Sequence, residues 1–218
     1  MPKCYYCDRE AVTTEHVPPK GIFPEEYRKN LITVKACSLH NNEKSDDDEY
    51  LRNILVCSLS VNSVGISHLA RKALKSILNN DNGMNSVIRN PENVVVNGKE
   101  TLSFEVDYKR VAKSVSLMSS ALLFHDTKTK YSGLWFVFMK DISINARPDF
   151  VEMSAFFHKA VEANISDFEE KKTENQEIFR YFFLDKSGVM IFRFVFYGGV
   201  ELFAITSTEI AEGMKKFI

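Results

Sequence analysis

Four side chains that bind zinc well occur as two short-spaced pairs near the start of the sequence. Cys4 and Cys7 form a C-x2-C pair, and Cys37 and His40 form a C-x2-H pair, with 29 residues between the two pairs. A structural zinc ion takes four nitrogen or sulfur ligands in a tetrahedral arrangement, and two such pairs can close around one ion. A redox pair would explain Cys4 and Cys7 but not the second pair. The spacing therefore predicts one structural zinc with no open coordination position.

A histidine lies between the two pairs and is not needed as a zinc ligand. His16 follows the carboxylate of Glu15 and precedes Pro18 and Pro19, which stiffen the chain. An isolated histidine is more often a packed or surface residue than a catalyst. Because this one lies inside the loop that the zinc pairs would close, we take His16 as a candidate catalytic residue.

Together these residues resemble the HNH endonucleases of the ββα-metal (His-Me finger) superfamily. The resemblance covers about residues 3 to 52 and includes the C-x2-C pair, the acidic residue followed by His16, and the second pair followed by Asn41 and Lys44. Within that family, the sequence is similar to a bacterial subgroup of stand-alone proteins that carry a zinc knuckle. The resemblance implies a metal-dependent endonuclease that hydrolyses DNA phosphodiester bonds and leaves a 5′-phosphate and a 3′-hydroxyl.

The resemblance also implies a role for each matching residue. His16 would be the general base that takes a proton from the attacking water, a task that suits a neutral imidazole. Glu15 and Asn41 would bind one catalytic divalent cation, Mg²⁺ or Mn²⁺, through oxygen atoms. Lys44 would support either the phosphate or the fold. The catalytic residues implied are therefore His16, Glu15, Asn41 and Lys44.

The sequence departs from the family pattern at three positions. Glu15 stands where aspartate is more usual, and His40 stands where the fourth zinc ligand is usually cysteine. Asn42 directly follows Asn41, so either amide is a candidate metal ligand. A non-catalytic zinc-knuckle module that binds nucleic acid or protein is the alternative function, and in it His16 and Asn41 would be structural.

Composition limits the function classes. The 218 residues are 44% hydrophobic and 12% aromatic, which is enough for a real core, and the net charge of −1 gives no global case for nucleic acid. Any DNA contact must therefore be local. The candidates near His16 are Lys20, Arg28, Lys29 and Lys35. Two basic helical stripes are further candidates, and for them a solvated helix face is the alternative: Arg71, Lys72 and Lys75, and Lys109, Arg110 and Lys113.

Neither a signal-peptide core nor an apolar run of about 20 residues is evident, so we expect a soluble cytoplasmic protein without membrane contact. Cys57 lies in an apolar run and is predicted to be a buried thiol. Partners implied by the resemblance are DNA and a protein such as an ATPase of antiphage defence, and a homo-oligomer is a further expectation.

The elements that must position these residues follow from local patterns. Residues 31–34 predict a strand of a hairpin with a long loop, and Ser45 with Asp48 predicts a capping box at a helix start. The acidic run 46–48 then suits the helix end better than a metal site. Apolar spacing extends this helix to Leu59. Further helices are expected over 67–78, 107–124, 156–163 and 210–217, with a turn at 79–83.

Strands are expected on both sides of Asn97-Gly98, and over 134–138, 178–184, 190–197 and 200–206, with short turns between the last three. The predicted fold class is α+β: an N-terminal ββα-metal (HNH) finger with a structural zinc, then helices and a C-terminal antiparallel β-meander. The predicted domains are a nuclease head at 1–58 and a mixed body at 59–218, which would recognise substrate, form oligomers or dock a partner.

Overall fold

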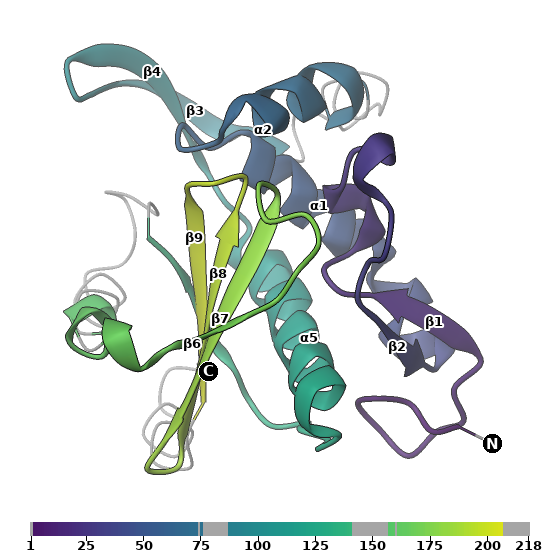
Figure 1. Ribbon diagram of the computed structural model, residues 1–218. Coiled ribbons are helices and arrows are strands. Elements are labelled where there is room, and N and C mark those ends of the chain that lie inside the picture. The colour runs from purple at the N-terminus through teal and green to yellow at the C-terminus, as the bar shows by residue number, and fades with distance from the viewer. Residues whose placement is uncertain (1, 74, 76–86, 141–156, 160, 207–218) are drawn as a thin grey trace.

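The computed structural model describes residues 2–73, 75, 87–140, 157–159 and 161–206, which form a mixed α+β fold with antiparallel sheets. Strands β1 (Thr13–His16) and β2 (Thr33–Ala36) form an antiparallel hairpin, and α1 (Ser45–Val56) follows it (Figure 1). Two short 3-10 turns, Lys20–Ile22 and Glu25–Tyr27, lie in the long loop between the strands. The predicted hairpin is confirmed. We call residues 2–56 the finger.

The predicted capping box at the start of α1 is wrong. Ser45 is the first helical residue, Lys44 occupies the cap position, and no side chain there accepts a hydrogen bond from the helix. Asp48 instead contacts Lys44 and accepts a hydrogen bond from Ser114, far along the chain. Leu59 is also not on the helix, which ends at Val56, and 71% of Leu59 is exposed. Tertiary partners therefore replaced the local cap.

The second helix begins earlier than expected. α2 covers Ser63–His68, and Asn62 caps it by accepting a hydrogen bond from the backbone N–H of Gly65 at 3.1 Å. A π-helical turn at Leu69–Ala73 follows. The predicted turn at 79–83, the end of the 67–78 helix and the helix at 210–217 lie outside the described residues. Of the expected 156–163 helix, residues 157–159 and 161–163 are helical.

A separate two-stranded sheet is made of β3 (Arg89–Val96) and β4 (Lys99–Glu105). Asn97 and Gly98 connect them with positive φ angles of 53° and 76°, as a type I′ turn requires. The predicted hairpin and its turn are confirmed.

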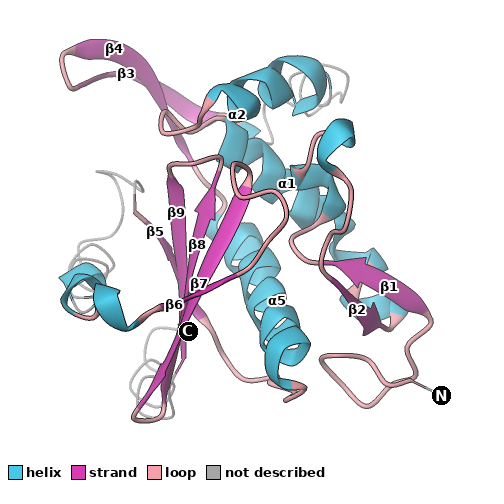
Figure 2. Cartoon of the chain, in the orientation of Figure 1, coloured by secondary structure: helices cyan, strands magenta, loops and turns pink. Residues whose placement is uncertain are grey.

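The helix predicted from residue 107 is α5 (Tyr108–Thr127), with Asp107 as a side-chain cap. A five-stranded antiparallel sheet in the order β5-β9-β8-β7-β6 lies beside it (Figure 2). Its strands are β5 (Phe136–Met139), β6 (Glu169–Lys171), β7 (Phe179–Lys186), β8 (Val189–Phe196) and β9 (Val200–Thr206). The predicted C-terminal antiparallel meander is confirmed in β7, β8 and β9.

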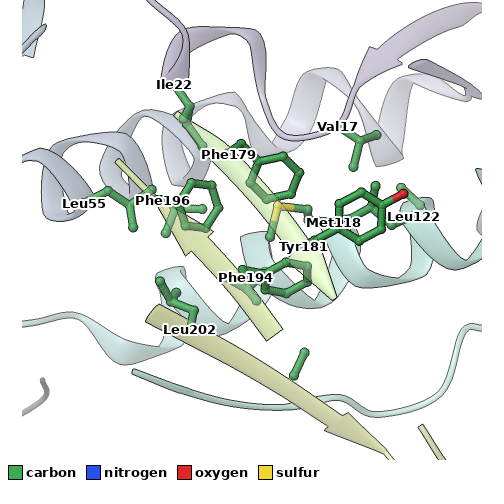
Figure 3. Close-up of a cluster of buried hydrophobic side chains, with 14 of the residues drawn as sticks. Val17, Ile22, Leu55, Met118, Leu122, Phe179, Tyr181, Phe194, Phe196 and Leu202 are labelled. Carbon is green, nitrogen blue, oxygen red and sulfur yellow. The ribbon is translucent and has the colours of Figure 1, made fainter. Parts of the chain in front are cut away.

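One apolar core runs through the finger and the sheet, with α5 between them. In Figure 3, Val17 and Ile22 from the finger lie beside Met118 of α5 and the aromatic side chains of β7 and β8. Strands bury alternate residues, which is why Phe179 and Tyr181 share this face. The core contacts of the finger thus cross the predicted domain boundary at 58/59. Among the described helices, none has the length and apolarity needed to cross a bilayer.

Candidate functional site

The four predicted zinc ligands come together. Their ligand atoms all lie within 4.8 Å of one another, and this is the only such cluster of potential metal ligands in the described part of the chain. His40 Nδ1 lies 3.6, 3.5 and 3.3 Å from the sulfur atoms of Cys4, Cys7 and Cys37, and the Cys7 and Cys37 sulfurs are 3.9 Å apart. Tetrahedral zinc bonds of about 2.3 Å to sulfur and 2.0 Å to nitrogen require separations of roughly 3.5 to 3.8 Å. The residues present therefore fit a zinc ion.

The surroundings of the cluster agree with thiolate and neutral imidazole ligands. Burial opposes ionisation of Cys4, but backbone N–H groups that point at its sulfur lower its pKa overall. Burial and the nearby Arg9 lower the pKa of His40, which favours the neutral ring. Burial raises the pKa of Cys7, and a bound metal ion would counter that effect through its charge.

The segment after α5 packs against the cluster of Cys4, Cys7, Cys37 and His40. The ring of Tyr6 lies 4.4 Å from that of His40, and the Tyr6 hydroxyl donates to the Ser132 carbonyl at 3.3 Å. Lys130 donates to the Cys7 carbonyl at 2.8 Å. Two residues from the later chain thus support the metal ligands, as outer-shell partners commonly do.

Glu15 lies in a buried ion pair rather than on an open surface. Its Oε1 is 2.8 Å from Lys44 Nζ, and the two side chains are about as buried as the core, with 5% and 3% of each residue exposed. Asp48 contacts the same ammonium from the next turn. Burial raises the pKa of Glu15, and Lys44 offsets part of that effect. One cation therefore serves two carboxylates.

The amide of Asn41 also has structural partners. Its Nδ2 donates to Thr13 Oγ1 at 3.0 Å and to the Thr14 carbonyl at 3.3 Å, which joins the turn after His40 to β1. Asn42 is exposed. In the arrangement described, the Glu15 carboxylate faces an ammonium, so Glu15 and Asn41 do not form a ready pair of oxygen ligands for a second cation. A catalytic cation does not fit these residues without displacement of Lys44.

His16 differs from its neighbour because it is partly exposed, at the end of β1. Partial burial, together with the positive charges of Lys20 and Arg28, lowers its pKa below the ordinary value of about 6.5. The imidazole is therefore mostly neutral at physiological pH and can accept a proton. Lys20 and Arg28 are two of the four basic residues that the sequence placed near His16.

Helix α5 covers this part of the finger. Leu117, Met118 and Ala121 line a crevice with Glu15 and His16, and the crevice is too narrow to hold a water molecule. The buried side of the site is therefore closed. His16 is therefore accessible only from its exposed side.

Three residues of the predicted basic stripes have intramolecular partners. Arg110 and Lys113 both pair with Asp47, at 3.0 and 2.7 Å, and thereby attach α5 to α1. Arg71 pairs with Glu26 at 3.0 Å.

Cys57, predicted to be a buried thiol, is half-buried and packs against the core.

The sequence did not indicate Asp48 and Ser114 as neighbours of the site. The sequence pattern favours a capping role for Asp48, and Ser114 is one of several small residues along α5. The apolar spacing of α5 predicts which face is buried, and a serine on a buried face needs a polar partner. This was the one available signal.

Comparison of the chain with protein-family models, with curated proteins and with solved structures finds no match in any of the three.

Proposed function

We propose that the protein is an HNH-type endonuclease that hydrolyses DNA phosphodiester bonds with His16 as general base. The observation that carries the proposal is a partly exposed histidine of lowered pKa at the end of a hairpin that also holds a zinc-type cluster. A neutral imidazole at that position can take a proton from water as the water attacks phosphorus.

The charges around His16 support a phosphate substrate. Lys20 and Arg28 act on the same imidazole, so a phosphodiester next to His16 would also lie near two cations. These cations would stabilise the charge that develops on the phosphate oxygens. Because the net charge is −1, we expect DNA contact at this local surface rather than over the whole protein.

A hard divalent cation would supply further neutralisation of the scissile phosphate. The resemblance to HNH enzymes implies Mg²⁺ or Mn²⁺ at Glu15 and Asn41, but the Glu15 carboxylate forms an ion pair with Lys44. The proposed step therefore uses His16, Lys20 and Arg28 without such an ion, and a nicking assay with and without divalent cations tests the metal requirement. A defence ATPase as partner rests on the same resemblance.

Nicking of supercoiled plasmid with Mg²⁺ or Mn²⁺ tests the proposal, with toxicity on co-expression as a second measurement in case a partner is needed. We expect His16→Ala to lose about 10² to 10⁴-fold of the activity, the usual contribution of a general base. His125→Ala is the matched control, because His125 is also a partly exposed histidine and lies at the end of α5. Equal activity of the wild type and His16→Ala, or no nicking and no toxicity in any condition, would contradict the proposal.

A second function is favoured by the buried ion pair and by the hydrogen bonds of Asn41. Both groups serve the fold in this arrangement, as they would in a non-catalytic zinc-knuckle module that binds nucleic acid or protein. DNA binding that His16→Ala leaves intact, in a protein that never cleaves, would favour the module.

A further inference from the structure

The hairpin of β3 and β4 carries large apolar side chains on its surface. It forms a two-stranded sheet of its own and extends away from α5 and the five-stranded sheet (Figure 1). Exposed fractions reach 68% for Val95 and 47% for Leu102. A two-stranded hairpin alone is marginally stable in water, and an open strand edge is a template for another strand. This hairpin therefore has the properties of a docking element.

The two edges of the hairpin are not equivalent. β3 contains Pro91, which has no N–H to donate, and its register is irregular between Arg89 and Glu92. β4 has neither a proline nor an irregularity. The edge of β4 is therefore the better site for a further strand.

The turn determines which residues of β4 face that edge. Val96 and Lys99 flank a two-residue turn, so they exchange hydrogen bonds across the hairpin, and so do alternate pairs beyond them. The pair Asn93 and Leu102 lies between such bonds. Leu102 therefore directs its backbone N–H and C=O outward, away from β3, and so do the residues two before and two after it.

The order of charges along β4 fits an antiparallel copy of itself. Lys99 and Glu105 are at its two ends, and Leu102 is at the centre. A two-fold axis through Leu102 would place each Lys99 opposite Glu105 of the second copy, with Leu102 opposite Leu102. The outward backbone groups match in this register, because Leu102 would exchange two backbone hydrogen bonds with Leu102 of the second copy.

The charges of the hairpin do not favour nucleic acid. Residues 89–105 contain two basic side chains, Arg89 and Lys99, and three acidic ones, Glu92, Glu100 and Glu105. A phosphate backbone needs an excess of positive charge, which this segment lacks.

We propose that β4 pairs with β4 of a second copy of this chain, so that two hairpins form one four-stranded sheet centred on Leu102. Each pairing would join opposite charges at both ends of the strand and cover the central leucines. This dimer does not depend on nuclease activity, and the surface lies outside the finger.

Sedimentation of the full-length protein over a range of concentrations tests the dimer. Leu102→Pro removes an outward N–H while leaving the bonds to β3 in place, and we expect it to weaken dimerisation at least tenfold. Val95→Pro is the matched control, since Val95 lies opposite Glu100 and its N–H faces the other edge. Far-ultraviolet circular dichroism confirms that both variants are folded. A wild type that stays monomeric, or equal effects of the two prolines, would overturn the proposal.

Charge reversal gives a test that misfolding cannot imitate. Lys99→Glu and Glu105→Lys should each weaken self-association, because like charges would then face each other at both ends. An equimolar mixture of the two variants should restore association, because every pair in the mixed dimer is again opposite in sign. Failure of the mixture to associate more strongly than either variant alone would also overturn the proposal.

Discussion

The finger and the five-stranded sheet are stabilised by different kinds of contact. The sheet buries stacked aromatic rings, such as Phe192 on Phe194 with centroids 5.6 Å apart. The finger buries thiol ligands and an ion pair of Glu15 and Lys44. Apolar packing loses stability in proportion to what is removed, whereas a metal cluster or a buried ion pair fails when one member is lost. The stability of the finger should therefore be far more sensitive than that of the sheet to replacement of a single polar residue.

Helix α5 connects the two regions and explains why the finger can bury charge. Its apolar face packs on the sheet, while Ser114 donates to Asp48 and Arg110 pairs with Asp47 on α1. Buried carboxylates are stable only when they have such partners. The buried charges of the finger thus depend on a helix that lies outside residues 2–56.

Loss of zinc should have the largest effect. Cys37→Ser should lower the zinc content from about one ion per chain to none, since structural zinc supplies much of the folding free energy of small domains. Elemental analysis measures the zinc, and hydrogen exchange should find that β1 and β2 lose protection while β8 keeps it. Cys57→Ser is the control, because Cys57 is a thiol outside the cluster. A finger that stays protected without metal would remove the distinction between the two regions.

Loss of the buried cation should have the second largest effect. Lys44→Met should lower the free energy of unfolding by about 3 to 5 kcal/mol, because Glu15 is left buried without its partner. Urea denaturation measures this, with the exposed Lys35→Met expected to change stability by no more than about 0.5 kcal/mol. Similar losses in both variants would contradict the role of the ion pair.

The pH dependence of Lys44→Met has a defined sign. Burial raises the pKa of Glu15 and Lys44 lowers it, so removal of Lys44 raises this pKa further. In Lys44→Met the folded state then binds a proton at Glu15 more tightly than the unfolded state does. The loss of unfolding free energy relative to the wild type should therefore shrink as the pH falls through that pKa. The double variant Glu15→Gln/Lys44→Met should likewise recover part of the loss.

Loss of a surface cation near His16 should have the smallest effect. Lys20→Gln should raise the pKa of His16, because Lys20 is one of the positive charges that lower it. Titration of the imidazole by NMR measures the shift without any assay of activity. Lys29→Gln, also an exposed lysine of the same loop, is the control. A lowered pKa in Lys20→Gln, or an equal shift in the control, would show that His16 does not sense Lys20.

Local patterns predicted the parts of the molecule that depend on near neighbours. The spacing of Cys4, Cys7, Cys37 and His40 predicted the cluster, because each short pair fixes two ligands on one turn. The Asn97-Gly98 turn and the apolar spacing of α5 were equally direct, since backbone angle and helical period are local properties. The capping box failed because Asp48 had better partners elsewhere.

The sequence alone determined the zinc-type cluster, the α+β class and the strands of the meander. The tertiary structure alone decided that Glu15 faces Lys44, that Asp48 bonds Ser114 across 66 positions, and that α5 closes one side of the site. The physical reason is that a buried charge takes the partner that packing brings to it, and that partner can lie anywhere in the chain.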